Sequence, residues 1–201
     1  MIDESNGYES IADLYIKWRG RAVDGIGSST VRAWALPLNK GSVILDLGCG
    51  TGIPVTKILL DEGLTVYALD ASPTMIESFR ENFPNVPVAC ESVESSPFFH
   101  RSFDGIIAVG LIFLLSEETQ RALISKMAAV LNPGGRLLFS APLEKVEWKD
   151  TMTGLLSRSL GAEQYRALLS AAGLSIVGEL VDEGGNYYFN AIRLTSIAIK
   201  P

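Results

Sequence analysis

The segment Asp46-Leu47-Gly48-Cys49-Gly50-Thr51-Gly52 decides the fold class of this chain. It follows a short apolar run over residues 43–47, which is typical of a buried strand. It precedes residues 53–61, where apolar side chains recur at helical spacing. Glycines allow a sharp turn and a close approach of a ligand to the backbone. The helix that follows would offer free N–H groups and the positive end of its dipole to that ligand.

The spacing of the glycines narrows the class of ligand. A dinucleotide fingerprint requires G-x-G-x-x-G, but Ile53 and Val55 stand where the third glycine would fall. A phosphate-binding P-loop requires Gly-Lys-Ser/Thr after four spacer residues, and this segment lacks it. The remaining pattern is D-x-G-x-G-x-G after a strand.

The rest of the chain alternates between strand patterns and helix patterns. Strands are predicted over residues 43–47, 64–69, 86–89, 103–109, 136–140, 174–181 and 187–197, and helices over residues 9–19, 30–36, 53–61, 72–83, 116–131 and 161–172. Such alternation predicts a mostly parallel sheet, and the last two strands must pair antiparallel because only a short turn joins them. We therefore expect an α/β fold, a three-layer sandwich with a seven-stranded, mostly parallel sheet that ends in an antiparallel strand and carries helices on both faces.

Composition and charge exclude several functional classes. The chain has 201 residues, 47% of them hydrophobic, and a net charge of −6, which fits a folded domain and not a disordered chain. Residues 43–140 hold eleven acidic and six basic side chains, and this acidic core disfavours nucleic acid as a partner. No apolar run reaches the length of a membrane span, and two cysteines cannot build a disulfide framework or a Cys-rich zinc site. We expect a cytoplasmic protein without membrane association or bound metal.

The glycine segment resembles motif I of the Rossmann-like (class I) S-adenosylmethionine-dependent methyltransferases. The resemblance extends from about residue 41 to 195. It includes residues 66–72, with Asp70 ending the second strand, and the Leu-Asn-Pro-Gly-Gly turn at residues 131–135. It implies an N-terminal helical arm or lid over residues 1–40 and a Rossmann-like methyltransferase domain over residues 41–201.

The resemblance also implies which residues bind the cofactor S-adenosylmethionine and its product S-adenosylhomocysteine. They are Asp46, Gly48, Cys49, Gly50, Gly52, Asp70, Ala71, Met75, Glu91, Ser92, Val93 and Val109. Asp46 would receive the ammonium of the methionine portion, directly or through water, and Asp70 would accept the ribose hydroxyls. Glu91 would accept the adenine amino group, although the family usually has an Asp there, and Cys90 replaces a common Gly.

Several of these residues could instead have a purely structural role or be exposed to solvent. Asp70 could simply cap a helix, Met75 could be a core residue and Glu91 a solvated acid. No side chain stands out as a general base, so the catalytic residue is unknown. The single histidine, His100, is expected on a surface loop, and the apolar stretch 111–115 is either a hydrophobic substrate wall or core.

Four residues are candidates for the substrate site: Tyr8, Tyr15, Gly110 and Trp148. The pattern Tyr8-x-x-x-Ala12-x-x-Tyr15 resembles that of small-molecule methyltransferases in which this helix folds over the cofactor. Trp148 lies in residues 144–160, a long connection that is either a binding loop or a plain surface crossover.

These features predict methyl transfer to a small-molecule acceptor by in-line displacement, catalysed mainly by positioning. A protein or RNA substrate is one alternative. A non-catalytic cofactor-binding protein of the same fold, or a nucleotide enzyme of another class, is the other. The protein is expected to be a monomer or a homodimer.

Overall fold

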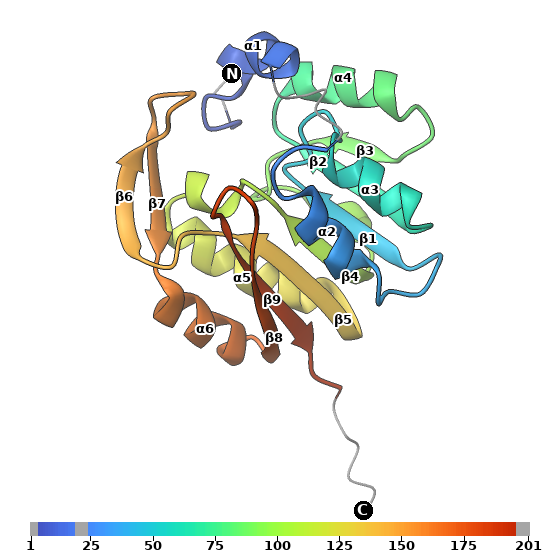
Figure 1. Ribbon diagram of the computed structural model, residues 1–201, viewed down its shortest axis with the longest axis vertical. Coiled ribbons are helices and arrows are strands. Elements are labelled where there is room, and N and C mark those ends of the chain that lie inside the picture. Colours follow the sequence, from blue (N-terminus) through green and yellow to red (C-terminus); the bar gives the residue numbers. More distant parts are fainter. Residues whose placement is uncertain (1–3, 19–23, 196–201) are drawn as a thin grey trace, which may run out of the picture.

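The computed structural model describes residues 4–18 and 24–195, and a seven-stranded sheet forms its centre (Figure 1). The strands run in the order β3-β2-β1-β4-β5-β9-β8. Their bounds are β1 Val43–Leu47, β2 Thr65–Asp70, β3 Val88–Cys90, β4 Phe103–Ala108, β5 Leu131–Ser140, β8 Leu174–Val181 and β9 Tyr187–Arg193. The pairs from β3 to β5 are parallel, whereas β9 lies between β5 and β8 and is antiparallel to both. The predicted fold class is confirmed.

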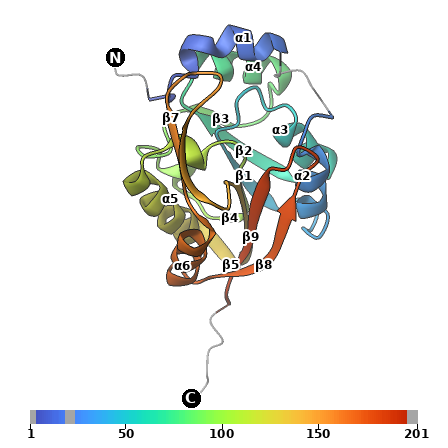
Figure 2. The ribbon, with the colours of Figure 1, turned by 60° about the vertical axis from the view of Figure 1, so that its left-hand side comes forward.

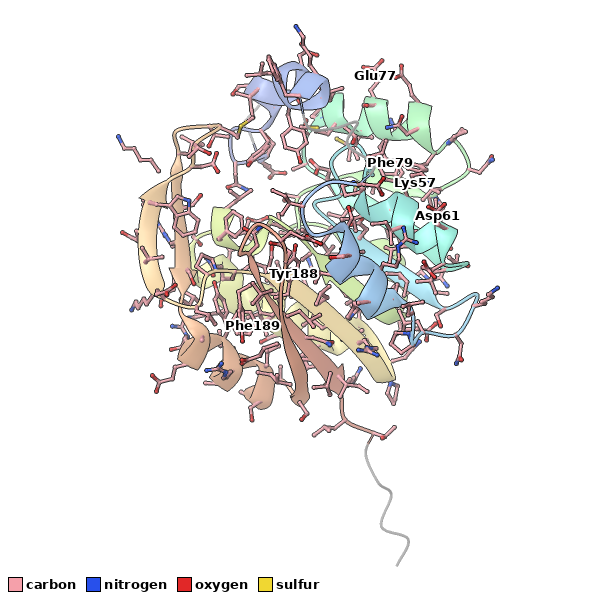
Figure 3. The ribbon with its side chains drawn as sticks, in the orientation of Figure 1. Lys57, Asp61, Glu77, Phe79, Tyr188 and Phe189 are labelled. Atoms are coloured by element: carbon pink, nitrogen blue, oxygen red, sulfur yellow. The ribbon has the colours of Figure 1, made fainter. Side chains whose placement is uncertain are left out.

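Helices cover both faces of this sheet. On one face lie α2 (Ser28–Ala35), α3 (Val55–Asp61) and α4 (Pro73–Asn82), and on the other lie α5 (Glu117–Val130) and α6 (Ala162–Ala171). Each face therefore has its own apolar core. Tyr188 and Phe189, neighbours in β9 that Figure 3 labels, are buried in different cores because successive strand residues point to opposite faces.

Capping residues fix where the helices α4 and α5 begin. Ser72 precedes α4, and its Oγ accepts the N–H of Met75 at 3.2 Å, while Pro73 occupies the first helical position. Ser116 precedes α5, and its Oγ accepts the N–H of Thr119 at 3.1 Å. Both helices begin within one residue of the predicted starts at residues 72 and 116.

The segment between β5 and α6 differs from the prediction. It contains a two-stranded antiparallel hairpin, β6 (Lys145–Lys149) and β7 (Leu156–Leu160), which stands beside the main sheet (Figures 1 and 2). The hairpin was missed because its strands are short and largely polar. The strand β5 also begins earlier than predicted, at Leu131, and Phe103 pairs with that residue before a register shift in β4.

The N-terminal segment has two parts with different packing. A short 3-10 helix, η1 (Glu9–Ile11), and α1 (Ala12–Trp18) lie against α4 (Figures 1 and 2). In contrast, α2 packs onto the sheet, where Trp34 is fully buried near Ile44. The proposed division at residue 40 stays a prediction, but α2 shares its core with the larger unit. Residues 19, 196 and 197 of the predicted elements lie outside the described residues.

Two further 3-10 turns flank β4, namely η2 (Phe98–His100) before it and η3 (Ile112–Leu114) after it. Within residues 4–18 and 24–195, no helix is both long enough and apolar enough to cross a membrane.

Candidate functional site

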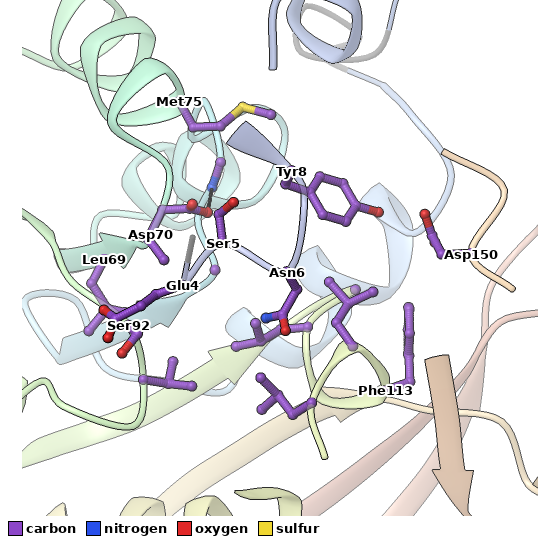
Figure 4. Close-up of a pocket in the computed structure, with 18 of the residues that line it drawn as sticks. Glu4, Ser5, Asn6, Tyr8, Leu69, Asp70, Met75, Ser92, Phe113 and Asp150 are labelled. Carbon is purple, nitrogen blue, oxygen red and sulfur yellow. Dashed lines mark hydrogen bonds between the residues drawn. The ribbon is translucent and has the colours of Figure 1, made fainter. Parts of the chain in front are cut away.

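A cavity of about 240 Å³ opens at the carboxyl ends of β1, β2 and β4 (Figure 4). The strand order reverses here, since β2 and β3 continue on one side of β1, and β4 and β5 on the other. Such a reversal point is where open α/β sheets bind ligands. The cavity is lined by Glu4, Ser5, Asn6, Tyr8, Tyr15, Gly48, Gly50, Leu69, Asp70, Ala71, Met75, Glu91, Ser92, Val93, Glu94, Val109, Gly110, Leu111, Phe113, Leu114, Leu115, Asp150, Thr151 and Met152.

Gly50 and Gly52, both in the turn after β1, have to be glycines for different physical reasons. Gly50 has φ +52°, and a Cβ atom on it would meet nothing within 4 Å, so this backbone faces the open cavity. Gly52 has φ +81°, and its Cβ atom would lie 2.5 Å from Cε2 of Phe83 and 2.8 Å from Cε2 of Phe79. Gly50 leaves room for a ligand, whereas Gly52, which does not line the cavity, leaves room for the core.

We expect Gly52→Ala to lower the free energy of unfolding by roughly 1–3 kcal/mol, because the added methyl group overpacks against two buried rings and φ is unfavourable. Urea unfolding at 25 °C measures this loss. Gly134→Ala is the matched control, since Gly134 has φ +80° and open space around it. An equal loss in both variants would show that backbone strain alone, and not the phenylalanine contacts, requires glycine at position 52.

Asp70 ties the glycine turn to the start of α4. Its Oδ2 accepts the N–H of Gly50 at 2.9 Å, and its Oδ1 accepts the N–H of Ser72 at 2.9 Å. Burial raises the pKa of this carboxyl group above its ordinary value. Asp70 therefore links the glycine turn to the residue before α4 and lines the cavity, whereas the capping residue of α4 is Ser72 and not Asp70. Each carboxylate oxygen has a second lone pair with which it can accept a ligand hydroxyl.

We expect Asp70→Ala to weaken binding of S-adenosylhomocysteine by roughly 1–3 kcal/mol, the cost of losing a charged hydrogen-bond acceptor. Titration calorimetry measures the change. Asp104→Ala is the control, because Asp104 also accepts a backbone N–H, that of Val43 at 2.9 Å, at the opposite end of the sheet. Unchanged affinity in Asp70→Ala would remove Asp70 from the ligand site.

Asp46 lies beneath the turn and not on the cavity surface. Its side chain is 2% exposed, and Oδ2 accepts the hydroxyl of Thr56 at 2.6 Å. Burial, partly opposed by that hydrogen bond, raises the pKa of Asp46 to about 7. The carboxylate of Asp46 would thus reach a ligand ammonium only through an intervening water molecule or after a small movement of the side chain.

The ends of β3 and β4 form two walls of different polarity. Beyond β3, Glu91 is half-buried, and its N–H donates to the carbonyl of Asp70 at 3.0 Å, while Ser92 and Val93 are buried. Beyond β4, Gly110 donates its N–H to Ser140 Oγ at 2.8 Å. The apolar stretch that follows faces the cavity through Leu111, Phe113, Leu114 and Leu115, while Ile112 is core.

The roof of the cavity comes from two segments far apart in the sequence. Tyr8 and Tyr15 line it with their rings in edge contact, the centroids 5.9 Å apart. The carboxylate of Glu9 anchors this arm to α4, where it accepts the hydroxyl of Ser72, the N–H of Thr74 at 3.2 Å and the hydroxyl of Thr74 at 2.7 Å. The tip of the β6–β7 hairpin closes the other side through residues 150–152.

The two parts of the roof touch each other. A Cβ atom on Gly7 would lie 2.8 Å from Cδ1 of Leu155 and 3.3 Å from Cβ of Thr153, so the arm and the hairpin tip are in close contact. The long connection after β5 is therefore part of the site. Its length was the only sequence feature that pointed there.

Most of the sequence-predicted site residues come together at this cavity. Nine of the twelve candidate cofactor residues line it, and so do Tyr8, Tyr15 and Gly110. Asp46, Cys49 and Gly52 do not line it, and Cys49 is buried beside the α2–α4 core. Trp148 also lies off the lining and packs against Phe113, with ring centroids 5.5 Å apart. The sequence analysis missed residues 4–6, and it gave the connection 144–160 as a possible binding loop without singling out residues 150–152 as site residues.

The ionisable groups of the lining are all acidic. They are Glu4, Asp70, Glu91, Glu94 and Asp150, together with the two tyrosines. His100 is exposed in η2 and does not line the cavity. In the described part of the chain, no three His, Cys, Asp or Glu side chains are grouped so that they could hold a metal ion.

Comparison with known proteins finds a family match over part of the chain. Residues 44–135, which contain the glycine turn, Asp70 and the walls beyond β3 and β4, match the family model described as "Methyltransferase domain". Over these residues, slightly less than half of its length, the chain is similar to methyltransferases. The chain is 28% identical over 213 aligned positions to the biotin biosynthesis bifunctional protein BioHC of Teredinibacter turnerae, a match that covers 94% of this chain and 36% of that protein. The chain spans between 36% and 65% of the first curated relatives that it matches.

Solved structures share the fold of this chain. The 1,6-didemethyltoxoflavin-N1-methyltransferase of Burkholderia thailandensis, solved with bound 1,6-didemethyltoxoflavin and S-adenosylhomocysteine, is 18% identical with a TM-score of 0.73. The match covers 97% of this chain and 92% of that chain. The [4+2]-cyclase SpnF is 19% identical with a TM-score of 0.75, covering 96% and 97%. At these identities the likeness concerns the fold, which hosts both activities.

Proposed function

We propose that the protein is an S-adenosylmethionine-dependent methyltransferase whose acceptor is a small, partly apolar molecule. This proposal rests on the cavity, which has a polar end and an apolar end. Both ends lie beneath the roof formed by the N-terminal arm and the tip of the β6–β7 hairpin. Asp70, Glu91 and Ser92 supply the polar end, and the stretch after β4 supplies the apolar end.

The residues present fit the cofactor. Open space faces Gly50, so an extended ligand can lie against the backbone of the turn. The carboxylates of Asp70 and Glu91 are suited to ribose hydroxyls and to an adenine amino group, and Met75 offers an apolar contact for a base. When bound, S-adenosylmethionine supplies a methyl group activated by its sulfonium.

The chain's own contribution is positioning and exclusion of water. Leu111 and Phe113 hold an apolar acceptor body against the wall after β4, and the roof limits the access of water to the reacting atoms while the cavity keeps an opening to solvent. The closed roof supports a small acceptor over a protein or RNA segment, because Gly7 and Leu155 meet across it. The acidic lining also disfavours phosphate polymers. The cytoplasmic location and the monomer or homodimer state stay predictions.

Two measurements test this proposal. Calorimetry should show micromolar binding of S-adenosylhomocysteine and no comparable binding of NAD. Transfer of label from methyl-labelled S-adenosylmethionine should then appear in the small-molecule fraction of a cell extract and not in protein or RNA. Binding without any transfer would favour a non-methylating activity, as in the cyclase of the same fold. NAD binding alone would overturn the proposal.

A further inference from the structure

We propose that the methyl acceptor is a cationic amine and that the carboxylate of Asp150 binds its nitrogen. This inference rests on the proposed function and narrows its substrate class. It starts from the hairpin tip, which no sequence motif marked and which nevertheless places a buried acid on the cavity wall.

The local structure of the tip fixes the Asp150 carboxylate in one orientation. Oδ1 accepts the N–H of Met152 at 3.0 Å, the N–H of Thr153 at 2.8 Å and the hydroxyl of Thr153 at 3.0 Å. The backbone closes the tip as well, because the N–H of Asp150 donates to the carbonyl of Leu155 at 2.8 Å. One oxygen is therefore held by three donors and cannot rotate away without losing them.

The other oxygen, Oδ2, receives no hydrogen bond from the described residues, although the Asp150 residue is only 9% exposed. Asp150 lines the cavity, and Figure 4 shows its carboxyl group facing the hydroxyl end of Tyr8, on the side away from Asp70 and Ser92. This oxygen is not enclosed by protein but opens onto the cavity, where a ligand can donate a hydrogen bond to it. The charge makes an ammonium the best donor.

The surroundings of Asp150 select a particular kind of amine. Five carboxylates line the cavity and none of its lining residues is Lys, Arg or His, so an anionic acceptor would be repelled and have no basic partner. Phe113 and Leu114 offer an apolar surface at the Asp150 side, and the rings of Tyr8 and Tyr15 add π faces that attract cations. The acceptor class is thus a small primary or secondary amine with an apolar body.

The movement of charge during methyl transfer agrees with an amine nitrogen beside Asp150. The bound ammonium first releases one proton to solvent, which frees the nitrogen lone pair. The lone pair then forms the N–CH₃ bond as the S–CH₃ bond breaks, and the electron pair of that bond stays on sulfur as a thioether. Positive charge moves from sulfur to nitrogen during transfer, and a fixed carboxylate beside the nitrogen stabilises the charge that develops there.

The test uses the full chain saturated with S-adenosylhomocysteine and a panel of matched ligands. Each set holds an amine, the alcohol and the carboxylate of similar shape, for example phenethylamine, 2-phenylethanol and phenylacetate. Calorimetry should show that the best amines bind more than tenfold tighter than their alcohols, and that the carboxylates do not bind. A panel in which no amine exceeds its matched alcohol overturns the proposal.

The variant Asp150→Asn keeps the shape of the side chain and removes its charge. We expect it to abolish the amine preference while the affinity for S-adenosylhomocysteine stays within twofold. Glu118→Gln, which removes the same charge from the exposed start of α5, should keep the preference. If Asp150→Asn instead weakens S-adenosylhomocysteine tenfold, Asp150 serves the cofactor and the inference is wrong. Failure of S-adenosylhomocysteine to bind the wild type would refute the proposed function itself.

Discussion

Gly50→Val should reduce the affinity for S-adenosylhomocysteine by more than a hundredfold, about 3 kcal/mol, while the chain still folds. The backbone of Gly50 has φ +52° and faces empty cavity space, so a branched side chain would project where the ligand lies. The same side chain also strains the turn, because β-branched residues rarely adopt positive φ. Titration calorimetry with S-adenosylhomocysteine measures the effect.

Gly41→Val separates the two causes. Gly41 has φ +80° and open space around its Cβ position, but it precedes β1, at the opposite edge of the sheet from the cavity. We expect both variants to lose a similar amount of thermal stability and only Gly50→Val to lose ligand affinity. Wild-type affinity in a folded Gly50→Val protein would contradict a ligand path along this turn.

The second large effect concerns Asp46, whose pKa rises to about 7 in the folded protein because the carboxyl group is buried. The unfolded chain loses this proton near pH 4. Between pH 4 and 7 the folded state therefore binds more protons than the unfolded state, and stability falls as the pH rises. The loss amounts to about 1.4 kcal/mol per pH unit, or about 4 kcal/mol across the window, and it levels off above pH 7.

Asp46→Asn should remove this component of the pH dependence. Asn cannot ionise, and its side-chain oxygen can still accept the Thr56 hydroxyl that Asp46 accepts at 2.6 Å. The free energy of unfolding, measured in urea from pH 4 to pH 8, should converge with or exceed the wild-type value as the pH rises. Asp13→Asn, at an exposed position of α1, should track the wild type. Parallel curves for Asp46→Asn and wild type would show that Asp46 ionises normally.

Local sequence patterns predicted the parts of the site that follow single strands. The glycine turn follows β1 and Asp70 is the last residue of β2, and parallel strands bring their carboxyl ends to one edge of the sheet. Residues that end successive strands of the sequence thus lie next to one another at the cavity. The pattern could not separate Gly50 from Gly52, because the phenylalanines that fill the space at Gly52 belong to α4 and the residue after it.

The sequence by itself determined the α/β sandwich, the order of its strands and helices from β1 through β5, and the location of the cavity floor, since each depends on periodicity, capping residues and glycines that act over a few positions. Only the tertiary structure decided the roof. Gly7 and Leu155 meet across the cavity although 148 positions separate them, and the buried carboxylate of Asp150 faces Tyr8 there. Such contacts depend on how the hairpin and the arm pack onto the finished sheet, and no local spacing encodes that packing.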